Sequence, residues 1–243
     1  MGPSFNEQFD QHGAWRRAFA QQLKQLAEWM SNHDLMDAAV QERLQRLEGQ
    51  VRTDQVMVAF VAEFSRGKSE LINAIFFADY GRRIMPASAG RTTMCPTELG
   101  YDSALPPSLR LLPIETRLQM QGLADWRLKP ERWVEIALDV NNADQIAKAL
   151  EEVSEIRRVS IEDARALGFW HDDLTDENPV PDVDGLVEVP MWRHALINIP
   201  HPLLKQGLVI LDTPGLNAVG AEPELTVNLI PQAHAVVFIL SAD

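Results

Sequence analysis

Apolar residues in the first fifty positions recur at helical spacing and leave polar residues between them. One stripe repeats every three or four residues, which predicts an amphipathic helix: Trp15, Phe19, Leu23, Leu26 and Met30. A break follows, and a second helix is expected, capped by Asp34 or Asp37 and ending near Gly49. Both stripes are predicted to be packing faces.

The pattern then changes to one that is typical of an α/β domain. The run VMVAFV at 56–61 predicts a strand covered on both faces, and SELINAIFF at 69–77 predicts a helix. Further buried strands are expected at 193–199, 208–212 and 235–240. A strand followed at once by a loop and a helix is the setting in which phosphate-binding loops occur.

The middle of the chain carries weaker signals. Residues 81–108 are rich in proline and glycine and predict a loop, while LRLLPIE and WVEIAL predict two short strands. Residues 143–158 are amphipathic, which predicts a single helix. The sequence SIED at 160–163 is typical of a capping box that begins another helix.

Composition and charge narrow the functional classes. The chain has 243 residues, of which 46% are hydrophobic, and its formal net charge is −13, which argues against broad nucleic-acid binding. Its single cysteine, Cys95, excludes an internal disulfide and is expected to be buried or half-buried. No signal-peptide pattern opens the sequence and no run of 18 apolar residues occurs, so a cytoplasmic protein is expected.

The stretch AEFSRGKS at 62–69 matches a phosphate-binding loop in which Ala62 replaces the usual first glycine. Gly67 is expected to let the backbone approach the phosphates, where a Cβ would clash, and Lys68 to place its ammonium on them. The Ser69 hydroxyl is the expected Mg²⁺ ligand. The candidate nucleotide contacts are Glu63, Phe64, Ser65, Arg66, Gly67, Lys68, Ser69 and Glu70.

A second motif, LVILDTPGLN, begins at residue 208. The buried strand delivers Asp212 to its carboxyl end, where α/β sheets bind ligands, and Asp212 is expected to hold Mg²⁺ through water. Gly215 offers an unobstructed N–H to a terminal phosphate and a hinge when that phosphate leaves. A third stretch, GRTTMCPTEL at 90–99, lies between these motifs and supplies two candidate threonines for the metal, Thr92 and Thr93.

Together AEFSRGKSELINAIF, TTMCPTEL and LVILDTPGLN resemble the GTPase domain of the dynamin superfamily, most closely its bacterial members, over roughly residues 50–243. The family's switch threonine precedes a short step to a proline, which favours Thr93 over Thr92. The resemblance implies hydrolysis of GTP to GDP and phosphate with Mg²⁺. It also implies homodimers formed through GTPase domains, and membrane-associated work, with lipid contacts in regions that this sequence does not contain.

The fold implied is an α/β P-loop GTPase with a three-layer core and a mainly parallel sheet. Residues 1–50 would be a bundle-like or neck-like helical segment, and 51–243 a partial GTPase domain with an insertion at about 101–190. By analogy the four core strands would run in the order 2-3-1-4, so that 193–199 neighbours 208–212 and 235–240 forms an apolar edge.

Two departures from the family pattern affect the expected chemistry. Leu216 stands where small GTPases of the Ras type have a water-positioning glutamine. Ser65 matches the family's serine that orients water or a charge-compensating monovalent cation, and Arg66 either neutralises transition-state charge or is a solvated side chain. No [NT]-K-x-D motif occurs, so guanine specificity rests on the resemblance.

Rival interpretations remain. A P-loop ATPase, and a scaffold that binds nucleotide without hydrolysing it, are both compatible with the motifs. One acidic stretch admits a metal site, although a solvated loop is favoured because its spacing fits no defined cage: His171, Asp172, Asp173, Asp176, Glu177, Asp182 and Asp184. His194 and His201 flank a strand and are expected to be structural.

Overall fold

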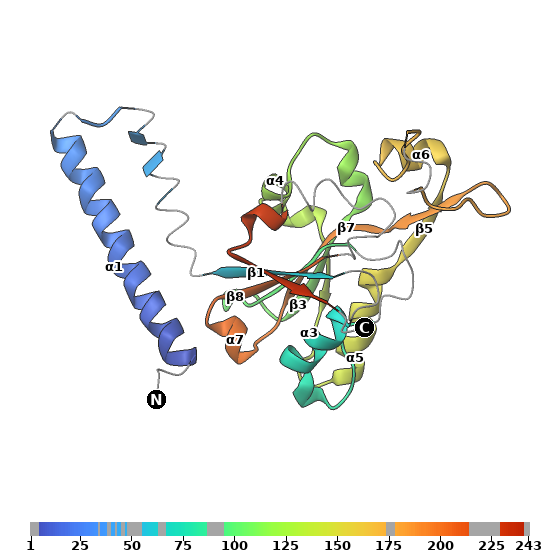
Figure 1. Ribbon diagram of the computed structural model, residues 1–243, viewed down its shortest axis with the longest axis horizontal. Coiled ribbons are helices and arrows are strands. Elements are labelled where there is room, and N and C mark those ends of the chain that lie inside the picture. Colours follow the sequence, from blue (N-terminus) through green and yellow to red (C-terminus); the bar gives the residue numbers. More distant parts are fainter. Residues whose placement is uncertain are drawn as a thin grey trace. The chain divides into compact units, whose positions relative to one another are not determined.

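A computed structural model describes residues 5–33, 35–37, 40–41, 43–44, 47, 55–62, 67–86, 95–173, 178–213 and 229–240 (Figure 1). The chain divides into two compact units, Met1–Gln55 and Val56–Asp243.

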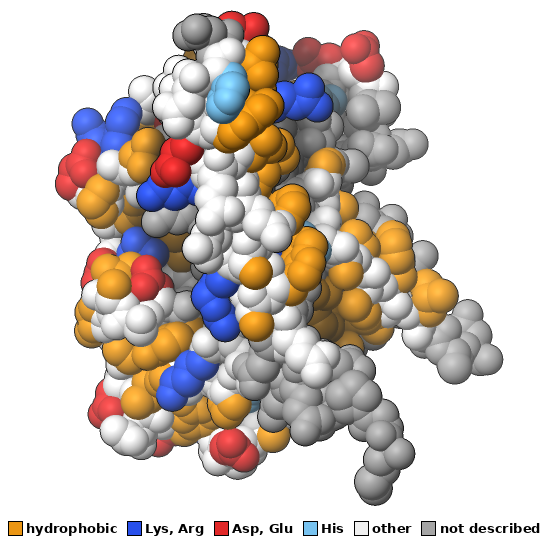
Figure 2. All heavy atoms as spheres, turned by 90° about the vertical axis from the view of Figure 1, so that its left-hand side faces the viewer, with side chains coloured by type: hydrophobic (Ala, Val, Ile, Leu, Met, Phe, Trp, Pro, Cys, Tyr) orange, Lys and Arg blue, Asp and Glu red, His pale blue; other side chains and the backbone are white. Residues whose placement is uncertain are grey.

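The described part of the first unit contains one long helix, α1 (Phe5–Asn32). It begins ten residues before the first residue of the predicted stripe and continues through Gly13. The helix carries the predicted apolar stripe, but two of its members, Trp15 and Leu26, are 58% and 44% exposed. Figure 2 looks onto the side of Figure 1 on which α1 is drawn and shows hydrophobic side chains reaching solvent between charged ones. The second helix is described only in part: the N–H of Val40 donates to the Asp37 carboxylate at 2.7 Å, as expected of a cap, whereas Asp34 lies outside the described residues.

In the described part of the second unit, a seven-stranded sheet runs in the order β4-β3-β7-β2-β8-β1-β9. Its strands are β1 (Val56–Ala62), β2 (Thr97–Gly100), β3 (Ser108–Pro113), β4 (Val134–Ala137), β7 (Trp192–Asn198), β8 (Leu208–Asp212) and β9 (Ala235–Ile239). The helices are α3 (Lys68–Phe76), α4 (Leu123–Arg127), α5 (Ala143–Glu151), α6 (Ile161–Ala166) and α7 (Pro202–Lys205). A separate two-stranded sheet pairs β5 (Ile156–Val159) with β6 (Val187–Pro190).

Successive residues of β1 face opposite layers, which is why this strand reads as a continuous apolar run. Phe60 packs into the core cluster that includes Ile72 of α3 and Ile146 of α5. Ala59 and Val61 point to the other face, into a cluster with Leu229. Both faces of the sheet are therefore covered, and the predicted α/β class with a three-layer core is confirmed.

The sheet contains both parallel and antiparallel strand pairs. β1 is parallel to both β8 and β9, and β2 is parallel to β7, whereas β2–β8, β3–β7 and β3–β4 are antiparallel. β9 ends the sheet, as predicted for an apolar edge, with Phe238 64% exposed.

Two predictions about the sheet were wrong. The strand at 193–199 does not neighbour the strand at 208–212, because β2 lies between them. Residues 81–108 are not all loop, since Thr97–Gly100 form that strand. The local sequence TELG is too short and polar to signal a buried strand, and tertiary pairing overrides it.

The single helix predicted over 143–158 was also wrong in its extent. α5 ends at Glu151, a short 3₁₀ turn follows, and Ile156–Val159 form β5 instead. The β-branched ends of that segment pair with β6, which no local periodicity reveals. The helix expected after SIED is confirmed as α6, whose N-cap Ser160 accepts the N–H of Asp163 at 3.0 Å.

Candidate functional site

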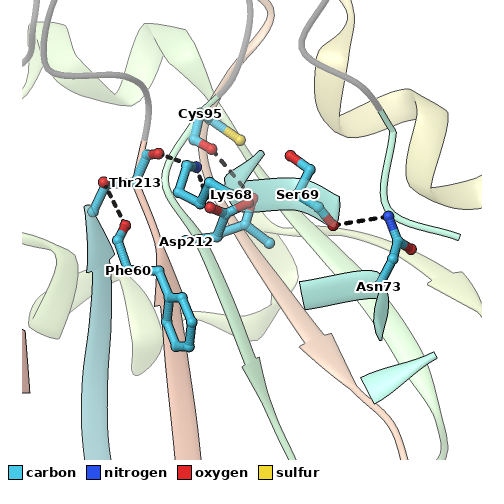
Figure 3. A network of polar contacts seen from close by, with 8 residues as sticks. Phe60, Lys68, Ser69, Asn73, Cys95, Asp212 and Thr213 are labelled. Carbon is cyan, nitrogen blue, oxygen red and sulfur yellow. Dashed lines mark hydrogen bonds and ion pairs between the residues drawn. The ribbon is translucent and has the colours of Figure 1, made fainter. Parts of the chain in front are cut away.

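The site candidates come together at the carboxyl ends of β1 and β8. Phe60 of β1 pairs in register with Asp212 of β8, and α3 begins at Lys68 a few residues after β1 ends. Adjacent parallel strands end at the same edge of a sheet, which is where α/β folds bind ligands. Figure 3 shows Lys68 lying over this edge, against Asp212 and Thr213.

Gly67 precedes the first turn of α3 in a left-handed conformation, with φ +83°. Side chains other than glycine rarely adopt such a backbone, so glycine is required for conformational reasons. The expected steric reason concerns the phosphates and stays a prediction, because no described protein atom lies within 4 Å of a Cβ built on Gly67. The space beside Gly67 is thus free of the described protein atoms.

Lys68 is buried, with 9% of the residue exposed. Its ammonium forms an ion pair with Oδ1 of Asp212 and donates a hydrogen bond to the carbonyl of Thr213. A buried ammonium requires such partners, because removing its charge from water without them is strongly unfavourable. These contacts hold the Lys68 ammonium at the carboxyl ends of the strands.

Asp212 is 3% exposed, and burial raises the pKa of its carboxyl, although the Lys68 ammonium opposes this shift. Its second oxygen, Oδ2, is buried and has no hydrogen-bond partner among the described residues. Beside it, the Thr213 hydroxyl donates to the carbonyl of Phe60 at 2.9 Å and ties the end of β8 to β1. An orphaned carboxylate oxygen at a sheet edge suits a further cationic ligand or a water bound to one.

Ser69 and Glu70 occupy the first turn of α3. Ser69 is buried, with 8% of the residue exposed. Glu70 is exposed and forms an ion pair with Arg83, which offsets a negative charge at the N-terminus of α3. The residues present therefore fit a divalent cation: a serine hydroxyl and an unpaired carboxylate oxygen are hard oxygen ligands.

Several predicted site residues lie outside the described part of the chain. They are Glu63, Phe64, Ser65, Arg66, Thr93 and Gly215, together with the alternatives Thr92 and Leu216. Their roles stay predictions.

A buried charged cluster on the next strand was missed by sequence reasoning. Glu98 of β2 is 6% exposed, accepts a hydrogen bond from His194 Nε2 at 2.9 Å and forms an ion pair with Arg127. Burial alone would raise the pKa of Glu98, but the hydrogen bonds and charges of His194 and Arg127 lower it to about 2. No local signal in TELG indicated this cluster, because the partners of Glu98 come from distant segments.

The remaining candidates have structural partners. His194 is buried against Glu98, and His201 accepts the N–H of Leu203 at 3.3 Å as the cap of α7, both in keeping with structural roles. In the acidic stretch, Asp172 pairs with Arg165, and Asp182 and Asp184 pair with Arg158, while 176–177 lie outside the described residues. Cys95 is buried, as predicted.

A cavity of about 460 Å³ lies at the end of the sheet away from Asp212. It is formed where β7, α3 and α5 meet, and its walls include Phe76, Tyr80, Asn141 and His201. Because β7 runs antiparallel to β8, the end of β7 is remote from Asp212, and this cavity is separate from the candidate site.

A buried strand, a glycine-led turn, a helix that begins with lysine and serine, and an aspartate on the neighbouring parallel strand define the class of P-loop nucleotide-binding α/β domains. Within the described residues, no helix has both the length and the apolar character needed to cross a bilayer.

Comparison with known proteins specifies the family. The sequence model of the Dynamin family matches residues 58–243, and the chain belongs to that family. A curated relative, "Bacterial dynamin-like protein" of Nostoc punctiforme, is 35% identical over 63 residues, which is 26% of this chain and 8% of that protein.

Two solved structures are similar to the chain. Both are described as an oligomerised bacterial dynamin pair that provides a mechanism for long-range sensing and tethering of membranes. One has a TM-score of 0.38 and 21% identity, covering 83% of this chain and 23% of the other; the second has 0.41 and 14%, covering 95% and 27%. The chain thus spans about a quarter of the length of these neighbours.

Proposed function

We propose that this protein binds GTP with Mg²⁺ and hydrolyses it to GDP and phosphate. The observation that carries the proposal is the meeting of Lys68 and Asp212 at the ends of parallel strands, with Asp212 Oδ2 buried and unpaired among the described residues. A lysine that can transfer its bonds to phosphate oxygens, beside a carboxylate that can hold hydrated Mg²⁺, is the arrangement that nucleotide hydrolysis requires.

Each residue has an assigned task. The ammonium of Lys68 and the backbone N–H groups of 63–70 bind the phosphates at the α3 N-terminus. Ser69, Thr93 and Asp212 hold the metal, whose charge offsets that of the phosphates, and the Gly215 N–H contacts the terminal phosphate. Lys68 must exchange Asp212 for phosphate when nucleotide binds, which frees the Asp212 carboxylate for the metal.

Catalysis then depends on positioning and electrostatics rather than on a general base. Ser65 orients the attacking water or a monovalent cation, and Arg66 neutralises charge in the transition state. Family membership supports two further parts of the proposal, pairing of GTPase domains between two copies and membrane-associated work.

Turnover of GTP and of ATP by the full-length protein, measured over a wide range of protein concentration, tests the proposal. We expect GTP to be preferred and the specific activity to rise with concentration, because pairing assembles the site. Absence of turnover at every concentration, with nucleotide still bound, would identify a non-hydrolysing scaffold, and preference for ATP would identify an ATPase.

The variant Lys68→Ala checks the site itself. It should weaken GTP binding by about a hundredfold (about 3 kcal/mol, typical of a lost charged contact). Lys205→Ala is the control, since Lys205 lies on α7 near the ring of Tyr101, at the other edge of the sheet. Unchanged affinity in Lys68→Ala would refute the assigned site.

A further inference from the structure

The side chain of Asn73, on α3, is buried and uses both ends of its amide. Its Oδ1 accepts the N–H groups of Ile84 at 2.9 Å and Met85 at 2.8 Å. Its Nδ2 donates to the carbonyls of Ser69 at 2.9 Å and Met85 at 3.0 Å. Asn73 is 8% exposed, so all four bonds are shielded from water.

These bonds join the first turn of α3, which belongs to the candidate site, to the segment at 84–85. One partner is the main chain of Ser69, whose hydroxyl is the proposed Mg²⁺ ligand; Figure 3 shows the Asn73 amide reaching it. The other partners are main-chain groups of Ile84 and Met85, which follow the 3₁₀ turn at Ala78–Tyr80.

Helix formation does not account for asparagine here. Asparagine is a poorer helix former than alanine or leucine, and Ile72 and Phe76 supply the buried apolar side of α3. A carbonyl four residues back, that of Ser69, would be satisfied by the helix alone, since the backbone ladder reaches from i to i−4. The bonds from Nδ2 to the carbonyls of Ser69 and Met85 therefore hold these two peptide groups in a fixed relative position.

We propose that Asn73 is a positioning residue that holds the Ser69 main chain against residues 84–85, so that the Ser69 hydroxyl is presented to Mg²⁺. The inference rests on the proposed GTPase function. Asn73 touches neither nucleotide nor metal and acts through the peptide groups that it binds. Groups that orient metal ligands in this way typically contribute about 10- to 100-fold to metal affinity or activity.

The chain contains a matched control. Asn198, at the end of β7, is 6% exposed and also makes four bonds: Oδ1 accepts the N–H of Asp102 at 2.7 Å, and Nδ2 donates to three carbonyls, those of Asp102, Leu105 and Pro106, at 3.2, 3.1 and 3.0 Å. It pairs with Gly100, at the far end of β2 from Thr97 and Asp212. It has the same chemistry and burial but no described link to the site.

Asn73→Asp and Asn198→Asp are the primary variants, because each keeps the shape and the acceptor and turns the donor into a repelling oxygen. Asn73→Ala and Asn198→Ala form a second pair should an aspartate prevent folding. Melting temperature, GTP affinity in EDTA, GTP affinity against Mg²⁺ concentration, and kcat and KM are measured for all.

We expect the two positions to lower the melting temperature alike and to leave GTP affinity in EDTA within about threefold of wild type. Only the Asn73 variants should need about tenfold more Mg²⁺ to reach half of the full gain in GTP affinity. Only they should lower kcat, by about tenfold, with KM within about twofold of wild type. Asn73 variants that match the Asn198 variants in Mg²⁺ dependence and kcat would overturn the inference. A wild-type protein without GTP binding would instead overturn the proposed function, and the inference with it.

Discussion

Lys68 and Asp212 are separated by 144 positions in the chain, yet the ammonium of one forms a buried ion pair with Oδ1 of the other. Each residue is brought there by a buried strand, β1 before Lys68 and β8 before Asp212, and the two strands are parallel neighbours. The other oxygen of Asp212, Oδ2, is buried and has no partner among the described residues. Removing either partner leaves the other as an uncompensated charge.

A double-mutant cycle should reveal this coupling. Lys68→Met and Asp212→Asn alone each leave one buried polar or charged group without its partner and should lower the free energy of unfolding by about 3–5 kcal/mol. The double variant should cost less than the sum of the two, by at least about 1 kcal/mol. Urea unfolding measures the three differences. Additive costs would show that the pair contributes no interaction energy.

Gly67 and Gly81 form a second matched comparison. Both have left-handed backbones, with φ +83° and +66°, and neither has a described protein atom within 4 Å of the position that a Cβ would occupy. Gly67→Ala and Gly81→Ala should each lower the free energy of unfolding by about 1 kcal/mol, the cost of this conformation for alanine.

Only Gly67→Ala should also weaken GTP binding, by about tenfold or more, because its Cβ meets the phosphates rather than protein. Titration of a fluorescent GTP analogue into both variants measures this. Equal affinities in the two variants would mean that phosphate does not approach Gly67 closely.

Glu98 should make the stability of the domain depend on pH. Its pKa falls from 4.5 to about 2 in the folded protein, so its ionised form stabilises the fold at any pH above about 5. That contribution, roughly 3 kcal/mol from a shift of this size, is lost as the pH falls from about 5 towards 2.

Glu98→Gln should therefore be less stable than wild type at neutral pH, and the difference should shrink as the pH is lowered through this range. Urea unfolding at about pH 7, 5 and 3 measures it. Glu115→Gln is the control: Glu115 is 52% exposed in its ion pair with Arg157, and its loss should cost under about 1 kcal/mol. A constant difference between wild type and Glu98→Gln would contradict the assigned pKa.

Local sequence was sufficient for the strand–loop–helix unit at the site. The run at 56–61 is apolar throughout because both faces of β1 are covered. The GKS sequence indicates the start of α3 without reference to distant segments. The capped start of α6 is equally local, since Ser160 and Asp163 are three residues apart. Family membership followed from the same short motifs.

Pairings between distant segments depended on tertiary structure. The position of β2 between β7 and β8 follows from contacts across the sheet, and the burial of Glu98 is tolerated only because His194 and Arg127 arrive from other elements. Asn73 likewise resembled an ordinary helix residue until Ile84 and Met85 were placed beside it.

The sequence by itself therefore determined the strand–loop–helix unit, the capped start of α6, the phosphate-loop motif and the family, because capping and periodicity act within a few residues. Tertiary structure alone decided the strand order, the buried Lys68–Asp212 and Glu98–His194 pairs, and the partners of Asn73. The physical reason is that a polar side chain is stable inside a protein only when its partners are present, and those partners lie far away in the chain.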